Sequence, residues 1–363
     1  MQIVVQGWEM TGASAPLVQA TRTVDTAALK PDEAVVRVAG CGVCHTDLGF
    51  YYDGVRTKHA LPLVLGHEIA GTVIAHGGSL GALEGRAVVV PAVLPCGECA
   101  LCRSGRATIC EKQIFPGNDD HGGFATHVVV PGRWLCPVDL RRLAHAGLEL
   151  ADLSVVADAV STPYHALRRA EVAARDLTVF IGVGGVGAFG VQLAKSMGAH
   201  VVAIDVDPKR LELVRAHGAD EVIDATKVER KAMRDVVRAF AKTRELPRVG
   251  WKIFETSGSA AGQLTAYSLL VHGAVLSVVG FTRDPVEVRL SNLMAFDAVA
   301  RGSWVCDPAL YPEIVEKVLS GDVRLGPFIE RRPLDSIQDT FEALKAHTLT
   351  KRPVLIPNHP EST

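Results

Sequence analysis

The stretch LTVFIGVGGVG, residues 177–187, decides the fold of the second half of the chain. An apolar run suited to a buried strand leads into glycines spaced G-x-G-x-x-G, and a helical pattern follows over residues 186–197. Such a turn binds dinucleotides, because glycines permit the tight turn and let the backbone approach a pyrophosphate at a helix N-terminus. The cofactor-binding candidates in this turn are Gly182, Gly184, Gly185, Val186 and Gly187.

An acidic residue, Asp205, ends the next predicted strand, 200–205, and lies 18 residues after Gly187. A carboxylate at this place accepts hydrogen bonds from a ribose 2′-hydroxyl and repels a 2′-phosphate. The sequence therefore predicts NAD as cofactor, in preference to NADP. The alternative is a glycine-rich turn that binds no nucleotide.

Outward from this turn, strand and helix patterns alternate over residues 177–279, and residues 303–306 could form the last strand. Regular alternation predicts an α/β fold, a doubly wound parallel sheet of the Rossmann type. The first 150 residues instead hold short segments rich in Val, Ile and Thr between Gly and Pro, which indicates a β-rich domain. We expect a β-rich domain of residues 1–158 and 305–363 and a nucleotide-binding domain of residues 159–304.

Composition excludes several classes of function. The net charge is −2 and no polybasic run is present, so a nucleic-acid partner has little electrostatic support. No apolar stretch reaches the roughly 20 residues of a membrane helix, and the first residues lack a secretory signal pattern. A cytoplasmic protein that acts on a small molecule is expected.

Half of the eight cysteines lie within 15 residues, as Cys96, Cys99, Cys102 and Cys110. Four thiolates in one loop satisfy a tetrahedral zinc ion completely and leave no position for a substrate. The cluster predicts a structural zinc site, with an iron–sulfur cluster as the alternative.

Two further motifs offer metal ligands, GVCHTD at residues 42–47 and GHEIAG at residues 66–71. Cys44 supplies a thiolate and His67 an imidazole, both ordinary zinc ligands. Two such residues alone could be a coincidence, since a lone histidine is more often structural.

With the cysteine lobe and GVGGVG in this order, the motifs resemble those of the zinc-dependent medium-chain dehydrogenases along essentially the whole chain. The resemblance implies a GroES-like catalytic domain and a catalytic zinc bound by Cys44 and His67. The third ligand of the family, often cysteine, precedes a T-x-Y-x-A-L signature, here residues 162–167. Asp158 occupies that position, and a carboxylate is an acceptable zinc ligand.

The resemblance also implies roles for charged and hydroxyl residues. Thr46 would take the alcohol proton, Asp47 would orient His67, and Glu68 would approach the metal during ligand exchange. Lys209 would lie near the adenosine ribose and Arg352 near the pyrophosphate. The alternatives are an N-cap for Asp47 and surface charges for Glu68, Lys209 and Arg352.

The implied activity is oxidation of a secondary alcohol to a ketone with hydride transfer to NAD, by a homodimer or homotetramer with two zinc ions per subunit. Within the family, the sequence most resembles members that oxidise 6-hydroxycyclohex-1-ene-1-carbonyl-coenzyme A to the 6-oxo compound in anaerobic aromatic degradation. A basic stretch, Arg56, Lys58 and His59, could bind such a coenzyme A thioester. Alternatives are another secondary alcohol or polyol, a zinc-free reductase on the same fold, and a non-catalytic NAD-binding redox sensor.

Overall fold

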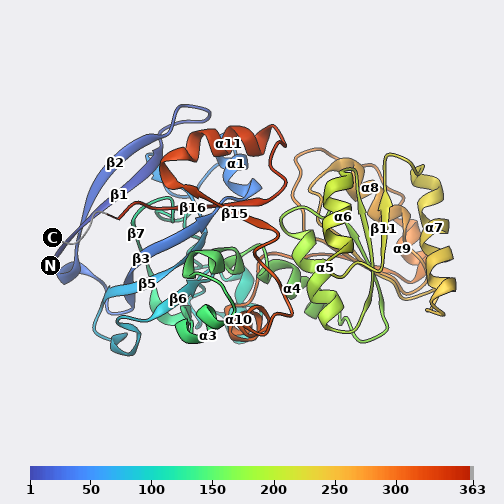
Figure 1. Ribbon diagram of the computed structural model, residues 1–363, viewed down its shortest axis with the longest axis horizontal. Helices are drawn as coiled ribbons and strands as arrows, with labels where there is room; N and C mark the ends of the chain where they lie inside the picture. The colour runs from blue at the N-terminus through green and yellow to red at the C-terminus, as the bar shows by residue number, and fades with distance from the viewer. Residues whose placement is uncertain (360–363) are drawn as a thin grey trace. The chain divides into compact units, whose positions relative to one another are not determined.

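A computed structural model describes residues 1–359 of the chain (Figure 1). The chain forms two compact units. Unit 1 comprises Met1–Ser161, Val305–Ser320 and the chain from Phe328 onward; unit 2 comprises Thr162–Trp304 and Gly321–Pro327. The last residues of the predicted first domain, 360–363, lie outside the described part.

Unit 1 is built on β-sheets. A seven-stranded sheet has the order β15-β16-β3-β5-β6-β8, with β7 paired to β3, and a three-stranded sheet has the order β2-β1-β4. The strands are β1 (Gln2–Met10), β2 (Val18–Asp25), β3 (Glu33–Gly42), β4 (Leu63–Val64), β5 (Glu68–His76), β6 (Ala87–Val90), β7 (His127–Pro131), β8 (Cys136–Pro137), β15 (Ile329–Pro333) and β16 (Arg352–Ile356). The helices are α1 (His45–Tyr51), α2 (Ala100–Arg103), α3 (Leu140–His145), the 3-10 helix η5 (Leu150–Ala157), α10 (Tyr311–Leu319) and α11 (Ile337–Lys345).

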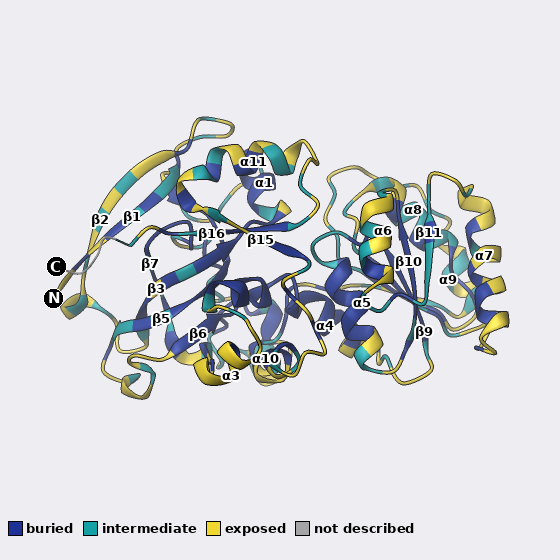
Figure 2. Cartoon of the chain, viewed as in Figure 1, coloured by how far each residue is buried: buried dark blue, intermediate teal, exposed yellow. Residues whose placement is uncertain are grey.

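The core of unit 1 lies around β3 and β5, where valines and isoleucines are fully buried (Figure 2). β3 is central because it pairs with β5, β7 and β16. The ends of β3 and β16 and the start of β5 meet here, since Gly42 pairs with Glu68 on one side and with Val354 on the other. This junction carries the first metal-binding motif.

Unit 2 is a six-stranded parallel sheet of order β11-β10-β9-β12-β13-β14. In Figure 1, α5 and α6 lie on one side of the sheet and α7, α8 and α9 on the other. The strands are β9 (Leu177–Ile181), β10 (His200–Asp205), β11 (Glu221–Asp224), β12 (Lys252–Glu255), β13 (Val275–Val278) and β14 (Val299–Gly302). The helices are α5 (Gly187–Ser196), α6 (Pro208–Arg215), α7 (Arg230–Thr243), α8 (Ala260–Ser268) and α9 (Ser291–Phe296), and α4 (Ser161–Arg169) begins at the boundary with unit 1.

The doubly wound parallel sheet expected from the sequence is confirmed, with its strand order reversing between β9 and β12. One strand prediction was wrong. The last strand is Val299–Gly302 and not residues 303–306. β14 is an edge strand whose residues are mostly exposed, so it lacks the apolar signal by which a buried strand is identified.

Within residues 1–359, no helix has both the length and the apolar character needed to cross a bilayer.

Candidate metal centres and cofactor site

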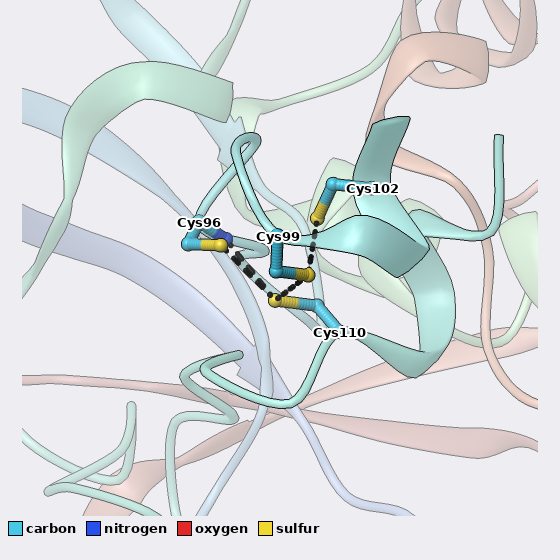
Figure 3. A group of neighbouring side chains, drawn as sticks. All are labelled: Cys96, Cys99, Cys102 and Cys110. Carbon is cyan, nitrogen blue, oxygen red and sulfur yellow. Dashed lines mark hydrogen bonds between the residues drawn. The ribbon is translucent and has the colours of Figure 1, made fainter. Parts of the chain in front are cut away.

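The sulfur atoms of Cys96, Cys99, Cys102 and Cys110 turn toward one another in one lobe of unit 1 (Figure 3). The Sγ–Sγ distances are 3.5 Å for Cys99–Cys102, 3.7 Å for Cys99–Cys110 and 3.5 Å for Cys110–Cys96. A tetrahedral zinc ion with Zn–S bonds of about 2.3 Å requires sulfurs about 3.8 Å apart. The four residues therefore fit a closed structural zinc site.

The backbone of the lobe favours thiolates at this place. The amides of Cys96 and Lys112 donate to the Cys110 sulfur at 3.4 and 3.3 Å. Two side chains anchor the lobe, as Arg133 donates to the Cys96 carbonyl and Trp134 to the Pro95 carbonyl. All eight cysteines are free thiols.

A second group of potential metal ligands lies in unit 1 and joins Cys44, His67, Glu68 and Asp158, all buried. Cys44 is the N-cap of α1, His67 directly precedes β5, and Asp158 ends η5. One carboxylate oxygen of Asp158, Oδ2, lies 3.7 Å from the Cys44 sulfur and 3.5 Å from Nε2 of His67. The structure thus brings the three predicted ligands together, from motifs 114 residues apart at the widest.

Asp47 holds two of these ligands. Its carboxylate accepts hydrogen bonds from the amides of Cys44 at 2.9 Å and Gly66 at 3.2 Å, and lies 3.4 Å from Nδ1 of His67. With Nδ1 facing Asp47, Nε2 of His67 faces the other ligands. Thr46 lies beside them, its hydroxyl 3.7 Å from the Cys44 sulfur.

Glu68 is paired with Arg352 in a fully buried, two-pronged ion pair. Nε of Arg352 donates to Oε2 at 2.8 Å and Nη2 to Oε1 at 2.5 Å, and the amide of Ala159 also donates to Oε1 at 3.1 Å. Burial raises the pKa of the Glu68 carboxyl, and the Arg352 guanidinium opposes that shift. Arg352, expected near a pyrophosphate, is thus bonded to Glu68 in unit 1.

The glycine-rich turn of unit 2 has the form that nucleotide binding requires. Gly182 has a φ of +84°, and a β-carbon there would collide with Ser257; one at Gly187 would collide with the Gly182 carbonyl. Gly184 and Gly185 continue the turn, and Val186 is the N-cap of α5. Asp205 ends β10 beside this turn, and its carboxylate accepts from the amides of Val183 at 2.7 Å and Asp207 at 2.9 Å.

The neighbouring basic residues Lys209 and Arg210 differ in their contacts. Lys209 is exposed, and its amide donates to Asp207, the N-cap of α6. The guanidinium of Arg210, in contrast, lies 3.5 Å from the position of a β-carbon at Gly184. Arg210 was not predicted from the sequence, although it is a basic residue directly after Lys209 in the same helix.

Comparison with known proteins agrees with this geometry. Residues 30–140 match the family model described as alcohol dehydrogenase GroES-like domain, and residues 185–320 match that described as zinc-binding dehydrogenase. An alcohol dehydrogenase of Geobacillus stearothermophilus is 28% identical over 92% of this chain and 94% of its own length. D-arabinose 1-dehydrogenase (NADP(+)) of Saccharolobus solfataricus is 28% identical, over 90% of each chain.

Among solved structures, the alcohol dehydrogenase of Aeropyrum pernix superposes with a TM-score of 0.83 and 29% identity, covering 97% of this chain and 100% of that one. The two family models together match more than half of the chain; the first match includes the cysteine lobe, and the second begins within the glycine-rich turn, at residue 185. The chain therefore belongs to the zinc-dependent medium-chain alcohol dehydrogenase family and is an oxidoreductase that acts on CH–OH groups with a nicotinamide cofactor.

Proposed function

We propose that the protein oxidises a secondary alcohol to a ketone with NAD, at a catalytic zinc held by Cys44, His67 and Asp158. The observation that carries this proposal is the convergence of one sulfur, one imidazole nitrogen and one carboxylate oxygen within 4.8 Å of one another, with Oδ2 of Asp158 3.7 Å from the sulfur and 3.5 Å from the nitrogen. One sulfur, one nitrogen and one oxygen donor suit zinc and leave a fourth coordination position for the substrate.

Glu68 is assigned a supporting role. Both of its oxygens bond to Arg352, and Oε1 also accepts from Ala159, so its carboxylate holds the backbone next to Asp158. Oδ2 of Asp158, in contrast, lies 3.7 Å from the Cys44 sulfur and 3.5 Å from Nε2 of His67. This difference favours Asp158 over Glu68 as the third ligand.

A zinc ion, when bound, supplies a Lewis acid that lowers the pKa of an alcohol. The protein's own residues then have separate tasks. The Thr46 hydroxyl lies beside Cys44. Its oxygen accepts the alcohol proton while the hydroxyl releases its own proton. Asp47 keeps the His67 ring in one orientation through its contact with Nδ1.

NAD is the proposed cofactor, bound by the turn that contains Gly182, Gly184 and Gly187. Asp205 lies beside this turn and disfavours a 2′-phosphate. We assign Arg210, rather than Lys209, the contact next to the turn, because its guanidinium lies over Gly184. The Arg352 contact with a pyrophosphate expected from the resemblance stays a prediction.

For the substrate, a 6-hydroxycyclohex-1-ene-1-carbonyl-coenzyme A ester is proposed, on the resemblance that includes Asp158. The basic residues Arg56, Lys58 and His59 support this substrate only in part, because Lys58 already forms an ion pair with Asp119 at 2.7 Å. A polyol is the second candidate, since similar proteins include enzymes named L-galactonate-5-dehydrogenase and D-arabinose 1-dehydrogenase.

The test measures NADH formation by the purified zinc-loaded enzyme with the thioester, cyclohexanol and sorbitol. Turnover of the thioester alone, lost in Asp158→Ala together with the catalytic zinc, is the expected result. If sorbitol or cyclohexanol is oxidised and the thioester is not, the family assignment stands and the proposed substrate is wrong. An Asp158→Ala enzyme with full zinc content would overturn the ligand assignment.

A homodimer or homotetramer is the proposed assembly. β14 is the edge strand of the sheet of unit 2, and Leu290 and Met294, which shortly precede it in the sequence, are 68% and 77% exposed. Such an edge pairs readily with another strand. Light scattering on the purified protein gives the assembly, and a monomer at micromolar concentration would contradict it.

A further inference from the structure

The backbone on which Asp158 sits is held on both sides. After it, the Ala159 amide donates to Glu68 at 3.1 Å. Before it, the Ala157 carbonyl accepts from the Ala92 amide at 3.3 Å, from the Ser161 hydroxyl at 3.0 Å and from the Tyr311 hydroxyl. The Glu68 side is part of the buried Glu68–Arg352 pair, whereas the other side depends on Tyr311.

Tyr311 is the first residue of α10 and is completely buried. Its hydroxyl donates to Ala157, and its oxygen lies 3.2 Å from both the Ala92 amide nitrogen and the Ser161 hydroxyl oxygen. One oxygen atom of α10 thus meets a loop after β6, the end of η5 and the first residue of α4, which lies 150 residues before Tyr311. Burial raises the pKa of the Tyr311 hydroxyl well above its usual range, so the group keeps the proton that it donates.

We propose that Tyr311 is a positioning residue for Asp158: by fixing the Ala157 carbonyl, its hydroxyl sets the place of the Asp158 carboxylate opposite Cys44 and His67. The inference rests on the proposed function, because it takes Asp158 as a metal ligand. An aspartate has only two side-chain torsions, so its carboxylate follows the backbone closely. Metal–ligand distances lie within about 0.2 Å of their ideal values, so a carboxylate on a less firmly held backbone binds the metal less tightly.

The test compares Tyr311→Phe with the wild-type enzyme and with Tyr267→Phe. Tyr267 lies on α8 in unit 2, and its hydroxyl also donates to a backbone carbonyl, that of Arg289, at 2.6 Å. The matched control therefore loses a bond of the same type far along the chain from every proposed ligand. The readouts are the zinc affinity of each site, by chelator competition, and the visible spectrum of the cobalt-substituted catalytic site.

In Tyr311→Phe we expect zinc affinity at the catalytic site to fall about tenfold, the low end for loss of a group that supports a ligand. The cobalt spectrum should change, since it reports ligand geometry. The four-cysteine site serves as an internal reference, because its affinity should be the same in all three proteins. If Tyr311→Phe does not fold, Ser161→Ala removes another hydroxyl from the same carbonyl and carries the same expectation.

Two failures are distinguishable. If Asp158→Ala binds catalytic zinc as tightly as the wild type, the ligand assignment and the proposed function fail together. If Asp158→Ala loses this zinc while Tyr311→Phe keeps wild-type affinity and an unchanged cobalt spectrum, only the role of Tyr311 is overturned. An equal loss of affinity in Tyr267→Phe would likewise overturn it.

Discussion

Replacing Gly42 by alanine should break the buried ion pair of Glu68 and Arg352. Gly42 ends β3, between the strands that carry these two residues, and the Glu68 carboxylate occupies the space of a β-carbon at position 42. Such a β-carbon would overlap Oε2 and lie 3.0 Å from the Glu68 β-carbon, so the glutamate must move away. Its displacement leaves the Arg352 guanidinium and the Ala159 amide without partners inside the protein.

Removing one partner of a buried ion pair costs about 3–5 kcal/mol. Because an alanine displaces Glu68 without deleting it, we expect the lower end, about 3 kcal/mol, for unit 1. For a unit of this size that corresponds to a fall in melting temperature of roughly 6–12 °C. Differential scanning calorimetry of the zinc-loaded protein measures it.

Gly78→Ala is the matched control for this prediction. A β-carbon at Gly78 has no neighbour within 4 Å, and the residue has no positive φ. It should therefore be neutral or slightly stabilising. If Gly42→Ala melts at the same temperature as Gly78→Ala, the reasoning about the space above Gly42 is wrong.

Three further predictions concern other parts of the molecule. Cys102→Ser should remove the structural zinc and lower the melting temperature while the catalytic zinc stays; metal analysis showing full zinc content would contradict the four-sulfur site. Asp205→Ser should raise KM for NAD roughly tenfold and reduce the preference over NADP, since a charge-assisted hydrogen bond is lost; steady-state kinetics with an unchanged preference would refute the role. Burial lowers the pKa of His127 from 6.5 to about 4, so the unfolded chain takes up this proton first and stability falls as pH drops across that window. As the pH drops from 6.5 to about 4, the melting temperature of His127→Gln should fall less than that of the wild type. Parallel curves of melting temperature against pH for the two proteins would exclude the effect.

Local spacing allowed much of the molecule to be predicted. The nucleotide turn and the cysteine lobe each lie within 15 residues, so their geometry follows from short-range chain constraints. Asp158 needed the family resemblance, because a single carboxylate carries no pattern of its own. The cytoplasmic location and the assembly stay predictions.

Other features depend on contacts that spacing does not encode. Arg352 pairs with Glu68 across 284 residues, and only the strand order β16-β3-β5 places them together. Lys209 and Arg210 differ by about 100° around one helix, so the choice between them depends on how α6 is set against the turn. Tyr311 belongs to no motif of the sequence, because its contacts with Ala92, Ala157 and Ser161 exist only in the folded chain.

The place of β16 in its sheet bears on the order of events during synthesis. Unit 2 is nearly continuous in sequence, so its parallel sheet can assemble while the ribosome is still adding later residues. Unit 1 cannot complete its fold at that stage, because β16 lies between β3 and β15. The first residue of β16 is Arg352, the arginine that pairs with Glu68. Until residues 352–356 emerge, β3 keeps an open edge and a buried carboxylate lacks its counter-charge. A nascent chain should therefore acquire its catalytic metal only after residues 352–356 have emerged, whereas the four-cysteine lobe can bind zinc much earlier.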